Sequence, residues 1–410
     1  MKKYKIGTLG CRTNQYESQA YATQLRGMGY EEAREGEEAD ICLINTCTVT
    51  EGADSSSRHQ IRQLRKRHPQ AKVVVTGCLA DRVANEIRAI EGVDAVILNK
   101  DKERLLELVL EEEVPEFKID HFAGHTRAFV KVQDGCDSFC TYCILPYVRG
   151  RSKSRGVDEI VDEVKGLVVN GYKEIVLTGI NIGDYEGEKG EKLADLVQAV
   201  DTIEGLERIR ISSIDPDEVD ERLTEVVLTG KNTCPSFHIV LQSGSNVVLK
   251  RMNRKYTKQV FLETVRRLKQ RSPLFAFTTD IIVGFPGETE TDFQETLEVM
   301  HEVQFAAVHM FPYSVRPRTR AALYPNKVPP AVIGARKEIV LRESEKGAFL
   351  LREGFVGKTL RVLIEDEETC FGHAENFLPV YVTRSLPRNT VVNVECFENR
   401  PDGLVGRVVS

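Results

Sequence analysis

The sequence predicts an α/β protein made of a doubly wound parallel sheet, a partial barrel of six β/α units and a small all-β barrel, in that order. Three observations support this prediction. Short apolar runs alternate with amphipathic stretches over residues 1–112, and the same alternation restarts over residues 125–352. Residues 354–410 contain apolar runs without helical patterns between them. A chain of 410 residues is also too long for a single hydrophobic core.

The first part is expected to contain four strands and four helices. The strands are expected at residues 4–9, 41–45, 73–76 and 95–98, and the helices at residues 14–28, 50–67, 81–90 and 101–110. Because helices separate the strands, the strands should pair in parallel and the helices should cover both faces of the sheet. An acidic stretch that contains a proline, residues 111–124, is expected to be a linker.

The central part is expected to contain six strands and five helices. The strands are expected at residues 128–132, 174–177, 208–212, 237–241, 276–283 and 307–311, and the helices at residues 158–170, 193–203, 217–228, 258–270 and 291–302. In parallel barrels the chemistry lies at the C-terminal ends of the strands. A charged helix at residues 333–351 should lead to the final strands, which are expected at residues 359–364, 380–382, 390–395 and 404–408.

The composition, 41% hydrophobic and 29% charged, is typical of a soluble globular protein. No run approaches the roughly 18 apolar residues of a membrane-spanning helix, and the N-terminus lacks the apolar segment of a signal peptide. A cytoplasmic location without membrane contact is therefore expected. Thiols stay reduced in that compartment, so the ten cysteines indicate metal binding or catalysis rather than disulfides.

The net charge of −6 argues against a uniformly basic surface for nucleic acid. Basic clusters nevertheless occur at residues 58–67, 149–155, 250–255 and 316–320. Any one of them is explained by an ordinary solvated helix face. Together they indicate a local surface that can bind a polyanion.

The strongest chemical signal is the cysteine set of Cys136, Cys140 and Cys143, which follows a predicted strand. Three thiolates can bind three irons of a 4Fe-4S cluster and leave the fourth iron open to the amino and carboxylate groups of S-adenosylmethionine. A zinc site would need a fourth Cys or His nearby, and the next candidates in the chain are Cys234 and His238. Structural zinc or buried thiols remain the alternative interpretation.

A second set, Cys11, Cys47 and Cys78, is dispersed along the first part of the chain. Each of these cysteines comes just after a predicted strand, and the C-terminal ends of parallel strands share one crevice where ligands bind. Convergence on one cluster is one interpretation, and buried structural cysteines are the other. The remaining cysteines have no ligand spacing and are expected to be core or incidental thiols; they are Cys42, Cys234, Cys370 and Cys396.

The two cysteine sets and their flanking residues resemble the radical-SAM methylthiotransferase family over nearly the whole chain. The motifs that carry the resemblance are TLGCRTNQYES, INTCTVT, TGCLA, KVQDGCDSFCTYCILPYVRGRSKSR, LTGINIGDY, ISSIDPDEV, LQSGSNVVLKRMNRKYT and TDIIVGFPGET. The segment GHAENF at residues 372–377 resembles the family's RNA-binding TRAM barrel. The chain departs from the family pattern in the segment before QSGS. The family usually has a proline in this segment, and this chain has Val240 instead.

This resemblance implies a methylthiotransferase domain with an auxiliary cluster over residues 1–112, a radical-SAM domain over 125–352 and a TRAM-like RNA-binding domain over 354–410. It implies two 4Fe-4S clusters and S-adenosylmethionine as cofactors. The implied partners are the anticodon stem-loop of tRNA and an electron donor such as flavodoxin or ferredoxin.

Within the family, TLGCRTNQYES, KVQDGC and RGRSKSR are most similar to the branch that converts N6-threonylcarbamoyladenosine at position 37 of tRNA to its 2-methylthio derivative. Methylthiolation of isopentenyladenosine in tRNA, or of an aspartate in a ribosomal protein, is the alternative within the enzyme class. An RNA-binding protein with structural metal is the alternative outside it.

The resemblance also implies roles for residues near the cysteines and the strand ends. Residues expected to bind S-adenosylmethionine or substrate are Tyr142, Thr178, Gly179, Ser212 and Gln242. Arg151 is expected to pair with the carboxylate of the threonylcarbamoyl group, since a guanidinium suits a carboxylate well. A phosphate contact or a surface ion pair is its alternative role. In the last domain, cationic residues and Phe377 are expected to contact RNA; the cations are Lys358, Arg361, Arg384, Arg388 and Arg407.

Overall fold

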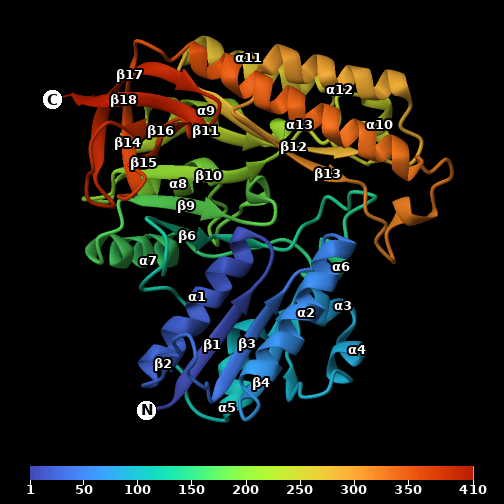
Figure 1. Ribbon diagram of the computed structural model, residues 1–410, viewed down its shortest axis with the longest axis vertical. Helices are drawn as coiled ribbons and strands as arrows, with labels where there is room; N and C mark the ends of the chain where they lie inside the picture. Colours follow the sequence, from blue (N-terminus) through green and yellow to red (C-terminus); the bar gives the residue numbers. More distant parts are fainter. Residues whose placement is uncertain (410) are drawn as a thin grey trace.

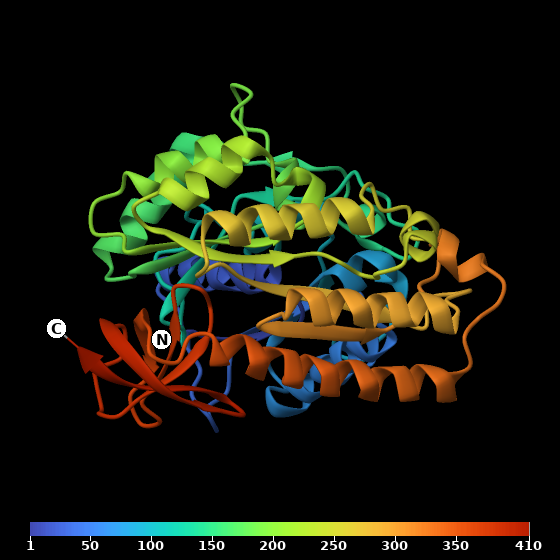
Figure 2. The same ribbon diagram turned by 90° about the horizontal axis from the view of Figure 1, so that it is seen from above.

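The computed structural model describes residues 1–409 and contains three regions (Figure 1). An N-terminal α/β region lies beside a central sheet of parallel strands, and a small β-barrel lies at the end of the central region where its strands begin. The view from above shows one long helix, α13 (Pro330–Glu353), running along the central region to this small barrel (Figure 2).

The N-terminal sheet has five parallel strands in the order β2-β1-β3-β4-β5. Its strands are β1 (Lys3–Thr8), β2 (Glu31–Glu32), β3 (Ile41–Thr46), β4 (Lys72–Gly77) and β5 (Ala95–Val96). Its helices are α1 (Arg12–Gly27), α2 (Glu51–Arg67), α3 (Cys78–Arg82), α4 (Ala84–Arg88), the 3-10 helix η1 (Asn99–Arg104) and α5 (Leu105–Leu110). The four predicted strands are confirmed. The helix expected at residues 81–90 is instead two short helices that are interrupted at Val83.

The segment expected to be a linker, residues 111–124, packs against the central region. Ile119 and Phe122 are buried in the core of that region. The backbone N–H of Ile119 donates to Glu163 Oε1 over 2.8 Å, and the hydroxyl of Tyr16 donates to the same oxygen over 2.9 Å. This segment therefore helps to hold the first two regions together.

The central sheet is open and parallel, with the order β13-β12-β11-β10-β9-β6, so the expected partial barrel is confirmed. Its strands are β6 (Arg127–Lys131), β9 (Glu174–Thr178), β10 (Arg208–Ile214), β11 (Thr233–Ile239), β12 (Ala276–Val283) and β13 (Ala307–Pro312). The covering helices are α7 (Val157–Val169), α8 (Leu193–Asp201), α9 (Glu221–Thr229), α11 (Lys258–Arg271) and α12 (Glu290–Val303). Shorter elements are β7 (Gln133–Asp134), α6 (Leu145–Val148), β8 (Lys153–Ser154), η2 (Ile182–Asp184), η3 (Pro216–Glu218), α10 (Asn246–Arg251) and η4 (Arg320–Leu323).

The C-terminal region is a closed barrel with the strand order β14-β15-β16-β18-β17. Its strands are β14 (Thr359–Asp366), β15 (Phe371–Ala374), β16 (Pro379–Val382), β17 (Val391–Arg400) and β18 (Gly403–Val409). The small all-β barrel is confirmed, although β15 was not predicted because its sequence, Phe-Gly-His-Ala, has no run of apolar or β-branched residues.

Two buried arginines of β10 dock this barrel on the central sheet. Arg208 Nη1 donates to the carbonyl oxygen of His373 over 2.9 Å, and Arg210 Nη2 donates to that of Ala374 over 2.8 Å. Both guanidinium groups also pair with the buried carboxylate of Glu174, at 3.2 and 2.7 Å. An unpaired buried charge is costly. The two arginines therefore need the carbonyl oxygens of the barrel as well as Glu174, and the barrel is held in place by the same hydrogen bonds.

Among the helices of residues 1–409, none combines the length and the apolar character needed to cross a lipid bilayer.

Candidate active site

The N-terminal cysteines lie at the ends of three neighbouring strands. Cys11 follows β1, Cys47 follows β3 and Cys78 begins α3 directly after β4. Gly10 has a φ of 95°, and a Cβ atom built there would lie 2.9 Å from Cys47 Sγ. Only glycine therefore lets the chain at residue 10 approach Cys47 this closely.

Gly77 permits a similar approach next to Cys78. It has a φ of 93°, and a Cβ atom there would lie 2.5 Å from the backbone N and O of Thr46. Burial raises the pKa of the Cys78 thiol to about 11 against the lowering effect of Arg149, and the thiols of Cys11 and Cys47 add to the increase. The three sulfurs are thus electrostatic neighbours at one edge of the sheet.

The second cysteine set lies in the loop after β7. The N–H of Cys143 donates to the carbonyl oxygen of Cys140 over 3.0 Å, and the N–H of Ser138 donates to Cys136 Sγ over 3.4 Å. Burial raises the pKa of Cys143 to about 12, and the thiols of Cys140 and Cys136 add to the increase. The loop therefore gathers its three thiols on one side.

Packing joins the two cysteine sets directly. Cys78 belongs to a small buried cluster with Ile144 and Val148, which lie in the loop and helix just after Cys143. The N-terminal sheet edge and the cysteine loop of the central region consequently share one interface.

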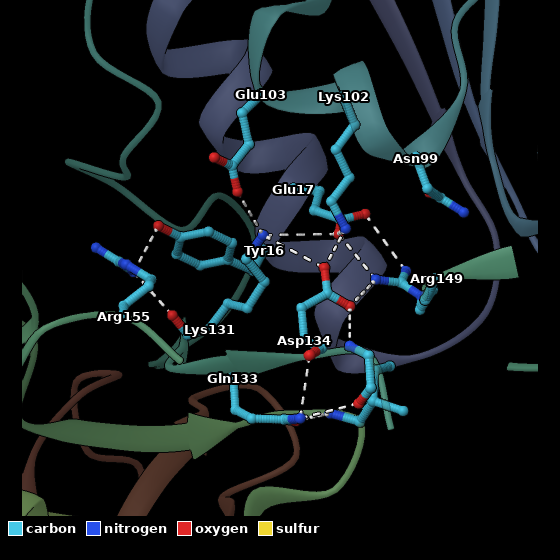
Figure 3. Close-up of polar contacts among 12 residues, drawn as sticks. Tyr16, Glu17, Asn99, Lys102, Glu103, Lys131, Gln133, Asp134, Arg149 and Arg155 are labelled. Carbon is cyan, nitrogen blue, oxygen red and sulfur yellow. Dashed lines mark hydrogen bonds and ion pairs between the residues drawn. The ribbon is translucent and has the colours of Figure 1, made fainter. Parts of the chain in front are cut away.

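A network of buried charges reinforces this interface (Figure 3). Arg149, whose side chain is fully buried, pairs with Glu17 over 3.0 Å and with Asp134 over 2.8 Å. Lys102 pairs with Glu17 over 2.7 Å and also with Asp134, while the ammonium of Lys131 lies 3.7 Å from Asp134. These pairs connect α1, η1 and the cysteine loop. Breaking such a buried pair is strongly destabilising, so the network fixes how the two regions are oriented.

Each cysteine set has one arginine that donates to a thiol sulfur. Arg149 Nε lies 3.3 Å from Cys78 Sγ, and Arg254 Nη1 lies 3.1 Å from Cys140 Sγ. Arg254 is held in turn by Asp215. Both arginines belong to basic clusters that the sequence assigned to a polyanion surface. That assignment is wrong for Arg149 and Arg254, because both side chains are largely buried and paired.

Three buried polar atoms, one in the cysteine loop and two towards the C-terminal ends of β10 and β11, have no hydrogen-bond partner within residues 1–409. They are Ser138 Oγ, Ser212 Oγ and Gln242 Oε1. The backbone of Gln242 has a φ of 63°, in the left-handed region that residues other than glycine rarely adopt. Unsatisfied buried acceptors and donors are costly, and they suit a site that a polar ligand completes.

The remaining predicted site residues take different positions. Gly179 lies against Gln133, whose Oε1 accepts from the N–H groups of Ile180 and Asn181 at 2.9 Å and orders this strand end. The backbone oxygen of Thr178 accepts from the N–H of Val132 over 2.9 Å. Gln133 was not identified from the sequence, because its partners are some 47 residues away.

Tyr142 and Arg151, in and just after the loop with the second cysteine set, differ in their exposure to solvent. Tyr142 packs against Phe285 with ring centroids 6.3 Å apart, at the edge of a small apolar cluster. The side chain of Arg151 is 71% exposed and pairs with Asp137 over 2.9 Å. Arg151 therefore lies at the surface, in an ion pair, and not in a buried pocket.

The aromatic ring expected to stack on RNA is already engaged. Phe377 stacks on His373 with centroids 4.6 Å apart, and the guanidinium groups of Arg210 and Arg127 lie 5.0 and 5.2 Å from its centroid. Two expected cations of the last domain are also paired, Arg361 with Glu207 and Arg407 with Glu395.

A cavity of about 260 Å³ lies between α1, the inner face of the central sheet and the C-terminal barrel. Its lining includes Arg12 of α1, Arg127 and Arg210 of the sheet, and Asn376 and Phe377 of the barrel. Burial lowers the pKa of Arg12 to about 10, and the nearby positive charges of Arg127 and Arg210 add to the decrease.

The thiols of the two cysteine sets are suited to binding iron–sulfur clusters. Among residues 1–409, no three His, Cys, Asp or Glu side chains are close enough together to hold a single metal ion. A four-iron cluster is larger than one ion and is bound by thiolates, which both sets provide. The arginine donors at two sulfurs and the unsatisfied atoms of Ser212 and Gln242 fit a thiolate-bound cluster with a polar ligand beside it.

The partial barrel and its cysteine loop define the class of protein, that of the radical-SAM enzymes. Residues 130–300 match the Radical SAM superfamily, and residues 3–98 match the Uncharacterized protein family UPF0004. The radical S-adenosylmethionine methyltransferase TsrM from Kitasatospora setae, solved with cobalamin and a 4Fe-4S cluster bound, has a similar fold. Its TM-score is 0.60 at 14% identity, with 79% of this chain and 77% of that chain covered.

Curated relatives narrow the class to one family. Threonylcarbamoyladenosine tRNA methylthiotransferase MtaB of Chlamydia pneumoniae is 46% identical, over 99% of this chain and 98% of that protein. The protein of the same name from Bacillus subtilis is 39% identical over 91% and 88%. A tRNA-2-methylthio-N(6)-dimethylallyladenosine synthase of Pelotomaculum thermopropionicum is 36% identical over 90% and 88%. The chain belongs to the radical-SAM methylthiotransferase family, in its MtaB-type branch.

Proposed function

We propose that this protein converts N6-threonylcarbamoyladenosine at position 37 of tRNA to its 2-methylthio derivative. The observation that carries the proposal is the shared interface of the two cysteine sets, in which Cys78 packs against Ile144 beside Cys143. A reaction that activates a base at one cluster and adds sulfur from another needs both clusters at one substrate site. The MtaB relatives, at 46% and 39% identity, support this choice of substrate.

We assign one 4Fe-4S cluster to Cys136, Cys140 and Cys143 and the other to Cys11, Cys47 and Cys78. The chemistry that these groups supply is reductive cleavage of S-adenosylmethionine at the first cluster and donation of sulfur at the second. The chain's own contribution is to exclude water and to orient the ligands. Arg149 and Arg254 donate to the sulfurs of Cys78 and Cys140, and these hydrogen bonds would favour the more negative, reduced state of the cluster that each cysteine would hold.

S-adenosylmethionine is assigned to the C-terminal ends of the central strands. Ser212 Oγ and Gln242 Oε1, both buried and unsatisfied, are suited to its polar groups. The ring of Tyr142 offers an apolar wall beside the cysteine loop. Gln133 holds the turn after Thr178 and Gly179 in place, so that its backbone can face the methionine end.

The tRNA partner is assigned to a polar groove of about 780 Å³ beside the cysteine loop. Exposed cations of this groove are Lys100, Arg151 and Lys153. Because Arg151 is exposed, we assign it to a phosphate of the anticodon stem-loop, where a guanidinium positions the RNA without reading sequence. The C-terminal barrel would add exposed cations at Lys358 and Arg384. An electron donor such as flavodoxin or ferredoxin, and a cytoplasmic location, complete the proposal.

Nucleoside mass spectrometry of tRNA from a deletion strain tests this function. The expected result is loss of 2-methylthio-N6-threonylcarbamoyladenosine, with its unmodified precursor accumulating, and recovery on complementation. A second candidate is the dimethylallyladenosine-modifying activity, since a relative of that name is 36% identical. Loss of the methylthio derivative of dimethylallyladenosine instead would select that candidate. Unchanged levels of both nucleosides would contradict a tRNA-modifying role.

A further inference from the structure

We infer that Arg12 binds the carboxylate of the threonylcarbamoyl group and is the residue that selects this substrate. The inference rests on the function proposed above and names the residue responsible for its specificity.

The position of Arg12 places a cation next to the sulfur-donating site. Arg12 is the first residue of α1 and directly follows Cys11, which we assigned to the second cluster. Its side chain lines the cavity of about 260 Å³ between α1, the central sheet and the C-terminal barrel. The cavity is therefore lined by the residue that directly follows a cysteine of the second set.

The guanidinium of Arg12 has no hydrogen bond or ion pair with any of residues 1–409 that the structure describes. It lies over the ring of Phe129, 5.5 Å from the centroid. The other arginines of the cavity are paired, Arg127 with Glu365 over 2.8 Å and Arg210 with Glu174 over 2.7 Å. Arg12 is thus the cavity arginine whose donors remain available to a ligand.

A charge that is partly removed from water is costly until a counter-ion meets it. The planar guanidinium matches a carboxylate with two parallel hydrogen bonds, and this geometry distinguishes it from an ammonium. A dimethylallyl group has neither charge nor donor, so it would leave Arg12 without a partner. The threonylcarbamoyl group ends in the carboxylate that Arg12 lacks.

The cavity has further features that suit such a group. Asn376 is fully buried, lines the cavity, and its Nδ2 has no partner within residues 1–409. Apolar walls are provided by Phe129, Val176 and Ile211. Small-molecule sites have volumes from about 300 Å³ upwards, so a cavity near this lower limit suits the side arm of a base rather than a whole nucleotide.

Arg151 is the alternative that the sequence favours, and its surroundings argue against it. Its side chain is 71% exposed and already pairs with Asp137 over 2.9 Å. An exposed ion pair contributes little free energy, because water screens it. Recognition of the charged carboxylate of the substrate is therefore better assigned to Arg12.

Equilibrium binding to the full-length, reconstituted protein tests the inference. The probes are anticodon stem-loop RNAs that carry threonylcarbamoyladenosine, its methyl ester, dimethylallyladenosine or unmodified adenosine. The proteins are wild type, Arg12→Gln, Arg12→Lys, Arg151→Gln and the control Arg266→Gln, which changes an exposed arginine of α11 paired with Glu302. Iron content and thermal midpoint of each variant are measured first, since Arg12 adjoins Cys11.

For the wild type we expect the acid to bind roughly 10- to 100-fold more tightly than its methyl ester, the usual contribution of a hydrogen bond to a charged group. Arg12→Gln should bind acid and ester equally, at the level of the wild type with the ester, and Arg12→Lys should be intermediate. Arg151→Gln should weaken all four RNAs by a similar factor, as loss of a phosphate contact does. Arg266→Gln should match the wild type.

Two results would overturn the role of Arg12 and leave the proposed function intact. One is that Arg12→Gln keeps the wild-type preference for acid over ester. The other is that it weakens all four RNAs equally, which would make Arg12 a structural or phosphate-binding residue. A wild-type protein that binds the threonylcarbamoyl RNA no better than the unmodified RNA would instead contradict the proposed substrate.

Discussion

Arg149 Nε lies 3.3 Å from Cys78 Sγ, and this contact crosses from the central region to the N-terminal sheet. Arg149 follows the loop that carries Cys136, Cys140 and Cys143, whereas Cys78 begins a helix of the other region. A guanidinium that follows one cysteine set in the chain therefore contacts a sulfur of the other set. Its position is fixed by Glu17 and Asp134, so the distance between the two sets depends on a buried ion network as well as on packing.

Measuring the iron content of cysteine variants tests which cysteines hold each cluster. Anaerobic reconstitution should give about eight irons and eight sulfides per chain, from two four-iron clusters. Replacing Cys136, Cys140 and Cys143 by Ala should remove about half the iron and abolish cleavage of S-adenosylmethionine. Cys370→Ala is the matched control, because this cysteine lies in the C-terminal barrel away from both sets. Full iron content in the triple variant would show that this site assignment is wrong.

Replacing the other set should have the opposite functional effect. With Ala at Cys11, Cys47 and Cys78, reductive cleavage of S-adenosylmethionine should continue while methylthio transfer stops, because the two clusters have separate tasks. The assay is quantification of 5′-deoxyadenosine alongside nucleoside mass spectrometry of the tRNA. Methylthiolated nucleoside from this variant would remove the sulfur-donating role from these cysteines.

Removing the C-terminal barrel should destabilise the central region. A chain that ends at Glu353 leaves Arg208 and Arg210 without the carbonyl oxygens of His373 and Ala374. The truncation also removes Glu365, the partner of Arg127, and breaking a largely buried ion pair in this way costs roughly 3–5 kcal/mol. We expect a lower thermal midpoint by calorimetry and poorer iron retention. If the shortened chain keeps both values, the docking contacts contribute little to stability.

Acid should weaken the same docking network. Burial alone would raise the pKa of Glu174, but the guanidinium groups of Arg210, Arg127 and Arg208 outweigh it and lower that pKa to about 2. A lowered pKa in the folded state adds stability that is complete above about pH 4.5 and is lost as the pH falls towards 2. The contribution of Glu174 is about 3 kcal/mol.

Urea unfolding between pH 3 and pH 7 measures this contribution. Wild type should lose stability as the pH falls below about 4.5, and Glu174→Gln should be less stable at pH 7 and show a shallower acid dependence. The matched control is Glu107→Gln, which removes an exposed carboxylate paired with Arg104. Equal pH dependence in wild type and Glu174→Gln would mean that other carboxylates control acid unfolding.

The alternation of strands and helices was predictable because it is a local property. Every expected strand is present, since buried parallel strands are short apolar runs that stand out between amphipathic helices. Four short strands were missed, β2, β7, β8 and β15, and they show the limit of this signal. Residues Glu31–Glu32 are both charged, and Phe371–Ala374 contains a glycine and a histidine and no β-branched residue, so the pairing of both strands depends on their neighbours.

The charged residues of the site were not predictable in the same way. Arg149 and Arg151 are two residues apart in one basic cluster, yet the first is fully buried and the second is 71% exposed. The difference comes from Glu17, which lies 132 residues from Arg149 in the sequence. Local patterns do not contain such long-range partners, whereas the spacing of Cys136, Cys140 and Cys143 is itself local.

The arginine donors should set the potentials of the two clusters independently. A hydrogen bond from a cation to a cluster sulfur stabilises the reduced, more negative cluster and so raises its potential. Arg149→Met should therefore lower the potential of the cluster beside Cys78, and Arg254→Met that of the cluster beside Cys140. For a one-electron couple about 59 mV corresponds to roughly 1.4 kcal/mol, so the loss of one such bond should give a shift of about 50–100 mV.

Anaerobic redox titration followed by electron paramagnetic resonance measures both clusters in each variant, and the cluster that keeps its arginine is the internal control. Because the two arginines donate to different sets, each substitution should move one potential and leave the other in place in variants whose iron content and thermal midpoint show that the ion network of Glu17 and Asp134 still holds the interface. If both potentials moved together in either variant, the arginines would act through the structure of the interface and not through their own hydrogen bonds.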